Sequence, residues 1–138
     1  KRLKARIAQS PMRLRIRVKE NSTEEEKAEL YRGAALFVYP SFYEGFGFPP
    51  LEAMSYGVPV VASSASSVPE VCDQAALLVS PWNVHEIKAG MSILLANQNL
   101  RDSHRAAGFQ QIKAYSWQKC AQDLLDIFNL QRKGINVV

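Results

Sequence analysis

The sequence predicts an α/β fold in which helices cover both faces of a doubly wound parallel sheet. Short apolar runs alternate with segments of helical periodicity along the 138 residues, and this alternation is typical of βαβ units. Two of the helical segments begin with a capping pair, Thr23 with Glu26 and Asn83 with Glu86. The apolar fraction of 47% and the charged fraction of 22% are ordinary for a globular chain, so we expect residues 1–138 to form a single domain.

Four segments are predicted to be strands. Residues 13–18 alternate arginine with an apolar residue, which is the period of a strand with one buried face. The other three segments are short, apolar and typical of strands in a covered sheet: residues 35–39, 58–62 and 76–79. Because helical segments separate them, we expect these strands to lie parallel in one sheet.

Helices are predicted at residues 1–9, 24–34, 69–72, 83–96, 100–115 and 117–133. A further helix begins at Pro49 or Pro50, since a proline in the first turn lacks only an N–H that would have no partner there. Gly57 is expected to end this helix as a left-handed cap. Ser116 separates the last two helices of the chain.

A loop with two glycines follows the predicted strand at residues 35–39. Residues 44–52 read Glu-Gly-Phe-Gly-Phe-Pro-Pro-Leu-Glu, and the last part of this stretch is the start of a helix. Ligands of parallel sheets bind beyond the carboxyl ends of the strands. The position of the loop therefore makes it the candidate site of this chain.

The backbone of this loop is suited to bind phosphate. Gly45 and Gly47 can take a positive φ and leave no Cβ between the main chain and a ligand. Consecutive amides in such a turn form an anion-binding concavity, and the helix start adds about half a positive charge. Since the two prolines have no N–H, the amides expected to bind are those of Phe46, Gly47, Phe48 and Leu51.

Two carboxylates flank the glycine loop and suit sugar hydroxyls, because each oxygen accepts hydrogen bonds. Glu52 is expected in the first turn of the helix, where it could accept from two neighbouring hydroxyls such as those of a ribose. Glu44 precedes the turn, on the side where a second sugar would lie. The alternative is that both are surface carboxylates around an ordinary turn. The aromatic residues Phe42, Phe46 and Phe48 fit a core better than a binding platform.

The first 19 residues carry eight basic residues and no acidic one, whereas the remaining residues carry nine basic and thirteen acidic residues. A basic segment can meet a diphosphate or a lipid headgroup, or it can be a solvated face. No nucleic-acid-binding module accompanies it, so nucleic acid is not expected as a partner. No apolar run approaches the roughly 20 residues of a membrane span. Cys72 and Cys120 lack metal-site spacing, which fits a reducing cytoplasm and no zinc.

Residues 30–121 resemble the C-terminal half of a retaining glycosyltransferase of family 4, with the GT-B architecture. The resemblance rests on Pro-Ser-Phe-Tyr-Glu-Gly-Phe-Gly-Phe-Pro at 40–49, Leu-Glu-Ala-Met at 51–54 and Gly-Val-Pro-Val-Val-Ala at 57–62. Val-Pro-Glu-Val at 68–71, Ala-Ala-Leu-Leu-Val at 75–79 and the late Ser-Trp at 116–117 complete it. It implies a Rossmann-like domain that binds a nucleotide-diphosphate sugar as the donor of a hexose.

The family pattern implies roles at matching positions. Glu52 would hold the ribose of a UDP- or GDP-sugar, and Glu44, beside the reacting carbon, would hold the donor hexose. The amides of Phe46, Gly47 and Phe48 would contact the sugar and the distal phosphate, and that of Leu51 the diphosphate. The hexose would pass to an acceptor hydroxyl with retention of anomeric configuration. The family commonly needs no metal or other cofactor, because basic side chains and the helix dipole stabilise the diphosphate.

The sequence departs from the family pattern on its N-terminal side. The acceptor-binding half is absent, so the donor domain reads as truncated and needs an acceptor domain or chain. The first strand of the C-terminal half and the Arg/Lys pair that faces the diphosphate are not found either. Arg13, Arg15, Arg17 or Lys19 could replace that pair. Glu70 matches a Pro-Glu pair of the family and is expected to be structural.

Two alternatives remain open at this point. The chain could be a non-catalytic remnant or interaction module that keeps the fold. It could also be a glycoside hydrolase, which needs two carboxyls about 5–10 Å apart across a sugar. For the transferase, the resemblance implies a cytoplasmic location, with contact at the membrane surface where a lipid-linked acceptor would lie.

Overall fold

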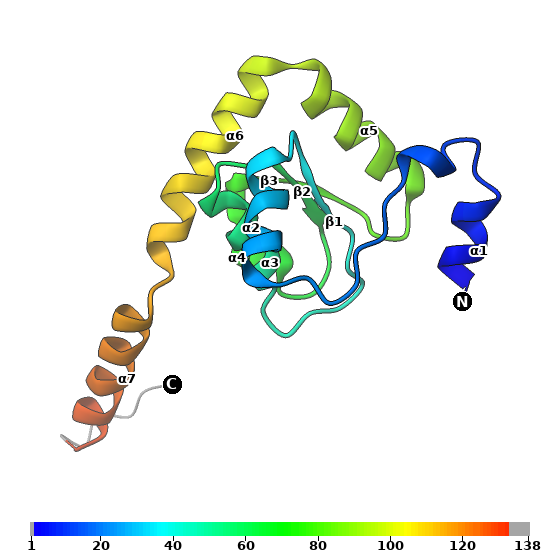
Figure 1. Ribbon diagram of the computed structural model, residues 1–138. Coiled ribbons are helices and arrows are strands. Elements are labelled where there is room, and N and C mark those ends of the chain that lie inside the picture. Colours follow the sequence, from blue (N-terminus) through cyan, green and yellow to red (C-terminus); the bar gives the residue numbers. More distant parts are fainter. Residues whose placement is uncertain (1, 133–138) are drawn as a thin grey trace.

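The computed structural model describes residues 2–132 and confirms the α/β class (Figure 1). Its sheet has three parallel strands in the order β1-β2-β3: β1 (Phe37–Tyr39), β2 (Val60–Ser63) and β3 (Ala76–Val79). Val61 lies opposite Val38 on one side and Leu77 on the other. The three expected apolar strands are all present, each within two residues of its predicted start.

Seven helices accompany these strands in the described part of the chain. They are α1 (Arg2–Ala8), α2 (Glu24–Gly33), α3 (Phe48–Ser55), α4 (Val68–Cys72), α5 (Val84–Ala96), α6 (Gln98–Gln111) and α7 (Trp117–Arg132). Short 3-10 turns lie at η1 (Arg13–Arg15), η2 (Asp73–Ala75) and η3 (Ile112–Ala114). Lys1 and Lys133, the predicted ends of the first and last helices, lie outside the described residues.

The predicted strand at residues 13–18 is wrong. This stretch forms the turn η1 and then an extended segment, and Leu14 is 89% exposed. Alternation of polar and apolar residues favours a strand only where a neighbouring strand takes up its backbone N–H and C=O groups. In the described sheet no strand pairs with this segment, so its apolar side chains stay in contact with water.

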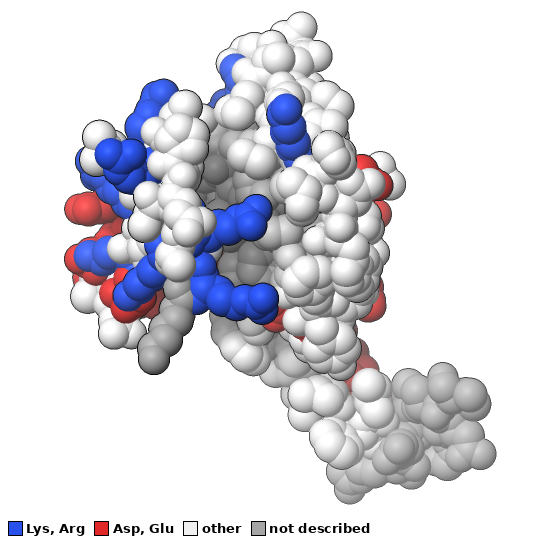
Figure 2. Space-filling model, turned by 90° about the vertical axis from the view of Figure 1, so that its right-hand side faces the viewer, with Lys and Arg blue, Asp and Glu red and all other residues white. Residues whose placement is uncertain are grey.

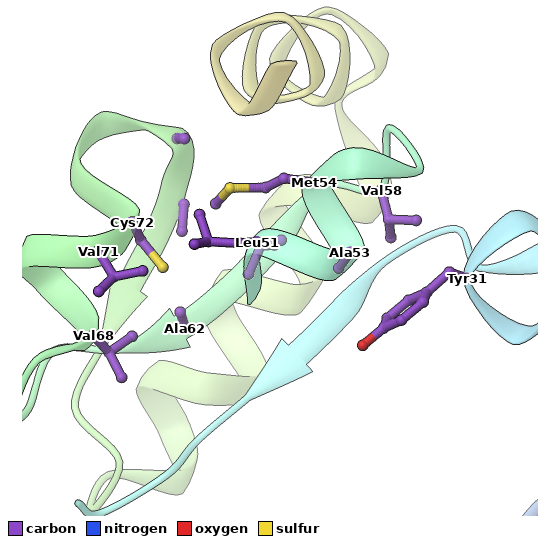
Figure 3. Close-up of a cluster of buried hydrophobic side chains, with 12 residues drawn as sticks. Tyr31, Leu51, Ala53, Met54, Val58, Ala62, Val68, Val71 and Cys72 are labelled. Atoms are coloured by element: carbon purple, nitrogen blue, oxygen red, sulfur yellow. The ribbon is translucent and has the colours of Figure 1, made fainter. Parts of the chain in front are cut away.

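The two faces of the sheet carry two separate cores, because successive side chains of a strand point to opposite faces. Val60 and Ala62 pack with Leu51 and Met54 of α3 on one face (Figure 3). On the other face, Val61 packs with residues of β3 and α5. The expectation of helices on both faces of the sheet is confirmed.

Helix α5 lies unusually close to its face of the sheet. A Cβ built on Gly90, in the middle of this helix, would stand 2.6 Å from the Leu77 side chain and 3.1 Å from that of Val79. A glycine inside a helix costs about 1 kcal/mol relative to alanine. The close approach of the helix backbone to β2 and β3 explains why a glycine is found here.

The helix ends follow the predicted signals. Thr23 and Glu26 form a reciprocal capping box at the start of α2. At the end of α3, Gly57 has a φ of 69°, and its N–H donates to the Met54 carbonyl at 2.9 Å. The Val58 N–H reaches the Ala53 carbonyl at 3.0 Å, which completes a Schellman motif. This motif turns the chain from α3 directly into β2.

Helix α7 extends away from the body of the domain (Figure 1). Its first residue, Trp117, is 81% exposed. Within residues 2–132, no helix combines the length and the apolar character that crossing a membrane would require.

Candidate functional site

The glycine loop leaves the carboxyl end of β1 and is fixed by the loop that follows β2. The Ser66 hydroxyl donates to the Glu44 carbonyl at 2.7 Å, and the Glu44 N–H donates back to that hydroxyl at 3.2 Å. The Ser67 hydroxyl lies 2.8 Å from the Phe46 carbonyl and 3.0 Å from that of Glu44. These serines lie in a Ser/Ala stretch that gives no sequence signal for such a role. The candidate loop is therefore held by a second loop of the same sheet edge.

Gly47 has the left-handed backbone conformation that both loop glycines can take, whereas Gly45 does not. Gly47 is the N-cap of α3, with φ 103° and ψ 58°, and it is buried. Positive φ is recorded for Gly47 and Gly57 among the described glycines. A Cβ built on Gly45 would meet no atom within 4 Å, so a ligand can approach the main chain at this point. Gly45 therefore does not use the positive φ that a glycine can take, although the open approach to its main chain is present.

Helix α3 begins one residue before the predicted prolines. Phe48 is its first residue, and Gly47 has no side chain with which to cap the first turn. Pro49 and Pro50 follow, so Phe48 and Leu51 carry the first N–H groups of the helix. The Leu51 side chain is buried in the core. Because the helix starts at Phe48, no acidic residue lies in its first turn, and the placement of Glu52 there is wrong.

The Glu44 carboxylate is held in a fixed orientation by two hydroxyl groups. Tyr39, the last residue of β1, and Ser41 both donate to its Oε1 atom, with Ser41 at 2.7 Å. The hydrogen bond from Tyr39, followed by that from Ser41, lowers the pKa of the Glu44 carboxyl. Burial and then the bond to Glu44 raise the pKa of Tyr39 to about 12. At neutral pH this site therefore presents an oriented carboxylate beside a neutral phenol.

Glu52 is held from helix α2. The Lys27 ammonium lies 3.2 Å from Oε1 of Glu52, and the hydroxyl of the buried Tyr31 donates to Oε2 at 3.1 Å. Burial, and then the hydrogen bond to Glu52, raise the pKa of Tyr31. Bonds to Glu24 and then to Glu52 raise the pKa of Lys27. Lys27 and Tyr31 are four residues apart on one helix face, but nothing in the sequence joins that face to Glu52.

A row of aromatic rings connects the two carboxylates. The Tyr31 ring contacts the Phe37 ring edge-on, with the ring centroids 5.5 Å apart. The Phe37 ring stacks on the Tyr39 ring, with the centroids 6.0 Å apart. Tyr31 holds Glu52 at one end of the row and Tyr39 holds Glu44 at the other. The rings of α2 and β1 thus position both carboxylates that flank the glycine loop.

The three phenylalanines of the loop region differ in burial. Phe46 packs against the core, as the core interpretation predicts. Its ring contacts the Tyr115 ring edge-on, with the centroids 5.5 Å apart. Phe42 and Phe48 are 60% and 55% exposed, so that interpretation is wrong for both. Phe48 is the first residue of α3 and its ring lies against that of Phe46, with centroids 4.6 Å apart, and Phe42 lies beyond the end of β1. A hollow of about 500 Å³ lies between Phe46, Phe48 and α7, with Trp117 and Leu124 among its lining residues.

Among residues 2–132, no group of three or more His, Cys, Asp and Glu side chains is placed to hold a metal ion. Cys72 is buried and Cys120 is exposed, and both are free thiols. Burial raises the pKa of Cys72 to about 11, which keeps it protonated at neutral pH.

The chain belongs to the family described as glycosyl transferases group 1, whose family model matches residues 1–111. Its fold is the Rossmann-like C-terminal half of the GT-B architecture. It is therefore a glycosyltransferase domain, and this membership does not favour a non-catalytic interaction module. Membership of a transferase family also gives no support to the hydrolase alternative.

Curated relatives include several mannosyltransferases. The chain is 44% identical over 107 residues to the O-antigen chain mannosyltransferase B of Escherichia coli, covering 78% of this chain and 28% of that protein. It is 35% identical over 113 residues to the MMP alpha-(1->4)-mannosyltransferase of Mycolicibacterium hassiacum, covering 77% of this chain and 27% of that protein. The chain therefore spans less than a third of the length of these relatives.

Two solved structures have the same fold. A sucrose-phosphate synthase from Thermosynechococcus elongatus superposes with a TM-score of 0.83 at 23% identity, over 96% of this chain and 34% of that chain. The C-terminal domain of a glycosyl transferase group 1 family protein from Francisella tularensis gives a TM-score of 0.62 at 27% identity, over 70% of this chain and 51% of that chain.

The two glycines of the loop should respond differently to alanine. Gly47→Ala forces a Cβ into the left-handed region and should destabilise the chain by about 1–2 kcal/mol. Gly45→Ala, the matched control, should change stability by less than about 0.5 kcal/mol, because its Cβ has open space. Urea unfolding measures both, and equal effects of the two substitutions would contradict the assignment.

Loss of the Tyr39 hydroxyl should change the pH dependence of stability. The pKa of the Glu44 carboxyl lies below its usual 4.5 in the folded chain, so ionisation of Glu44 favours folding. This contribution is present above pH 4.5 and is lost as the pH falls through the lower folded value. Tyr39→Phe should lower the melting temperature by roughly 3–6 °C at pH 7, and the difference should shrink towards about pH 3.

The exposed Tyr43 offers the control for this measurement. Tyr43→Phe should leave the melting temperature and its pH dependence unchanged. Titration of the Glu44 side-chain carbonyl by NMR should also show a higher pKa in Tyr39→Phe than in the parent chain. A pH-independent effect of Tyr39→Phe would show that the hydroxyl does not act through Glu44.

Proposed function

We propose that this domain is the donor-binding half of a retaining glycosyltransferase of family 4, which takes a hexose from a UDP- or GDP-sugar and transfers it to an acceptor hydroxyl. The observation that carries the proposal is the position of Glu44 and Glu52, held by Tyr39 and Tyr31, on either side of the loop that Gly47 turns into α3. Such a site offers acceptors for hydroxyls at both ends of an amide-lined turn.

Each part of the site takes one part of the donor. The amides of Phe46, Gly47 and Phe48 would bind the sugar and the distal phosphate, and that of Leu51 the diphosphate. Glu52, on the α2 side, would accept from the ribose hydroxyls. Glu44 would hold the donor hexose beside the reacting carbon. Fixed dipoles aimed at the departing diphosphate supply the stabilisation that such a transfer needs.

The names and lengths of the relatives support a choice of donor sugar and a need for an acceptor domain. Several of them are named mannosyltransferases, so GDP-mannose is the first donor to test. The chain covers 28% of the mannosyltransferase B, and the whole reaction needs an acceptor-binding domain or chain in addition to this one. The isolated chain should therefore bind the donor without transferring the sugar. No metal ion or other cofactor should be required for binding.

We also propose that the basic segment (residues 2–19) contacts the cytoplasmic surface of a membrane. Figure 2 shows Lys and Arg gathered on one side of the face that carries this segment. Lys4 and Lys19 pair with Glu20 and Glu26, and no ion pair is found within the described residues for its arginines: Arg2, Arg6, Arg13, Arg15 and Arg17. Leu14 and Ile16 are exposed between these arginines. Apolar side chains interleaved with cations suit an anionic lipid surface.

Calorimetric titration tests the donor site. The folded chain should bind GDP, UDP or one of their hexose derivatives with a dissociation constant between about 10 μM and 1 mM. Glu52→Gln should weaken binding about tenfold, because it removes the charge from an acceptor of two hydroxyls. Glu29→Gln removes an exposed carboxylate of α2, two residues from both Lys27 and Tyr31 and so on the other side of the helix, and should have no effect.

Two further observations decide this test. Binding should persist in EDTA, since the proposed site uses amides and side chains rather than a metal ion. Failure of the folded chain to bind any of these nucleotides at millimolar concentration would refute the donor site. An equal loss in Glu29→Gln and Glu52→Gln would show that the loss is not specific to the ribose contact.

Vesicle sedimentation tests the membrane contact. The chain should bind vesicles with 30% phosphatidylserine and not neutral vesicles, and the binding should weaken as salt is added. Combined glutamine substitution of Arg13, Arg15 and Arg17 should weaken it about a hundredfold, at about 1 kcal/mol per cation. The same exchange at Lys88, Lys113 and Lys119 is the control with equal charge loss. Equal losses in both triple variants would refute a specific role of the segment.

A further inference from the structure

Two exposed aromatic rings meet at the carboxyl edge of the sheet. Phe42 follows β1 and Trp82 follows β3, so the rings come from loops 40 residues apart in the sequence. Their centroids are 5.7 Å apart and their planes are tilted by 45°. Phe42 is 60% and Trp82 69% exposed. We call this pair the aromatic platform.

The exposure of the platform distinguishes it from a packing contact. Rings that meet to stabilise two loops gain most when the contact is buried, whereas these rings leave most of their area to water. Phe46, in the same loop as Phe42, is packed against the core. The chain thus packs one aromatic residue of this loop against the core and exposes another. An exposed aromatic patch at the ligand-binding edge of a parallel sheet indicates a binding surface.

The side chains of the two loops that carry the rings favour a neutral, polar ligand. Residues 40–45 and 80–86, which carry the two rings, contain no Lys or Arg. They contain the carboxylates of Glu44 and Glu86 and several hydroxyl and amide groups. A phosphate, an acidic lipid or a nucleic acid would meet the negative charge of these two loops, which supply no Lys or Arg of their own to offset it. A saccharide fits, since one ring face carries C–H groups and its rim carries hydroxyls.

We propose that the aromatic platform binds a pyranose ring of a saccharide acceptor. The C–H face of the sugar packs on Phe42 and Trp82, and its hydroxyls point towards polar groups of the same loops. Phe42 stands two residues before Glu44, whose carboxylate accepts a hydrogen bond from Ser41, the residue that precedes Phe42. The inference rests on the proposed function, because Glu44 is the residue that would hold the donor hexose. The platform then presents the acceptor sugar next to the donor sugar.

The same placement argues against stacking of the donor's base on these rings. Glu52, the proposed ribose contact, is held by Lys27 and Tyr31 of α2, at the opposite end of the aromatic row from Glu44. A base attached to that ribose lies on the α2 side. The platform adjoins Glu44, at the hexose end of the donor.

The two tryptophans of the chain make the test direct. Trp117→Phe leaves Trp82 as the sole tryptophan, and Trp82→Phe leaves the exposed Trp117 as the matched control. Each variant is titrated with mannotriose and with the methyl glycosides of mannose, glucose and galactose, up to about 100 mM. D-mannitol, which has the hydroxyls but no ring face, is the control ligand.

At least one of these saccharides should change the emission of Trp82 in a saturable way, with half-saturation in the millimolar range. Mannitol should not, and Trp117 should report no change with any ligand. Phe42→Ala in the Trp82-only chain should raise the half-saturation concentration at least fivefold. No saturable change of Trp82 with any saccharide, or an equal change with mannitol, would overturn the proposal, and so would an unchanged affinity in folded Phe42→Ala.

Nucleotide titrations separate this inference from the proposed function. A Trp82 signal that responds to GDP or UDP and not to saccharides would assign the rings to the base and overturn the platform. Nucleotide binding that depends on Glu52, without any saccharide effect, would leave the donor site standing and the platform refuted. Saccharide binding without nucleotide binding would support the platform and refute the donor site. The Trp82-only titration requires no change at either platform ring, so it does not depend on the folding of Phe42→Ala.

Discussion

Gly47 turns the chain from the β1 loop into α3 with a φ of 103°, a conformation that side chains rarely adopt. This one backbone state fixes where α3 begins and therefore which amides its first turn carries. It also places Glu52 in the second turn, where Lys27 and Tyr31 reach it. The N-terminus of α3, the packing of Leu51 and the orientation of Glu52 all depend on this position.

Around that turn, the polar side chains are oriented before any ligand arrives. Ser66 and Ser67 hold the carbonyls of the loop, and Tyr39 and Ser41 hold the Glu44 carboxylate. The Tyr39 contact joins the loop to β1, those of Ser66 and Ser67 join it to the loop that follows β2, and that of Ser41 lies within the loop. A site held in this way loses little conformational entropy on binding, which favours both affinity and correct placement of the reacting groups.

The surface of the chain separates two kinds of chemistry. Arginines and exposed apolar residues are concentrated in the basic segment, whereas the loops at the carboxyl edge of the sheet carry aromatic rings, hydroxyls and carboxylates. We propose that the first surface contacts a lipid headgroup layer and that the second binds sugars. The transfer that we propose to an acceptor near a membrane would use both surfaces, and the chain belongs to the glycosyl transferases group 1.

The sequence alone determined the α/β class, the three apolar strands, the helix caps and the position of the glycine loop, because these follow from local periodicity and from the backbone preferences of Gly, Pro and capping residues. It could not determine that residues 13–18 stay unpaired, since a strand exists only with a neighbour. The sequence also carries no signal that Glu52 contacts Tyr31, that Ser66 anchors the loop, or that Phe42 contacts Trp82. Only the tertiary structure decided these contacts, because each joins residues more than 20 positions apart through the packing of separate elements on one sheet.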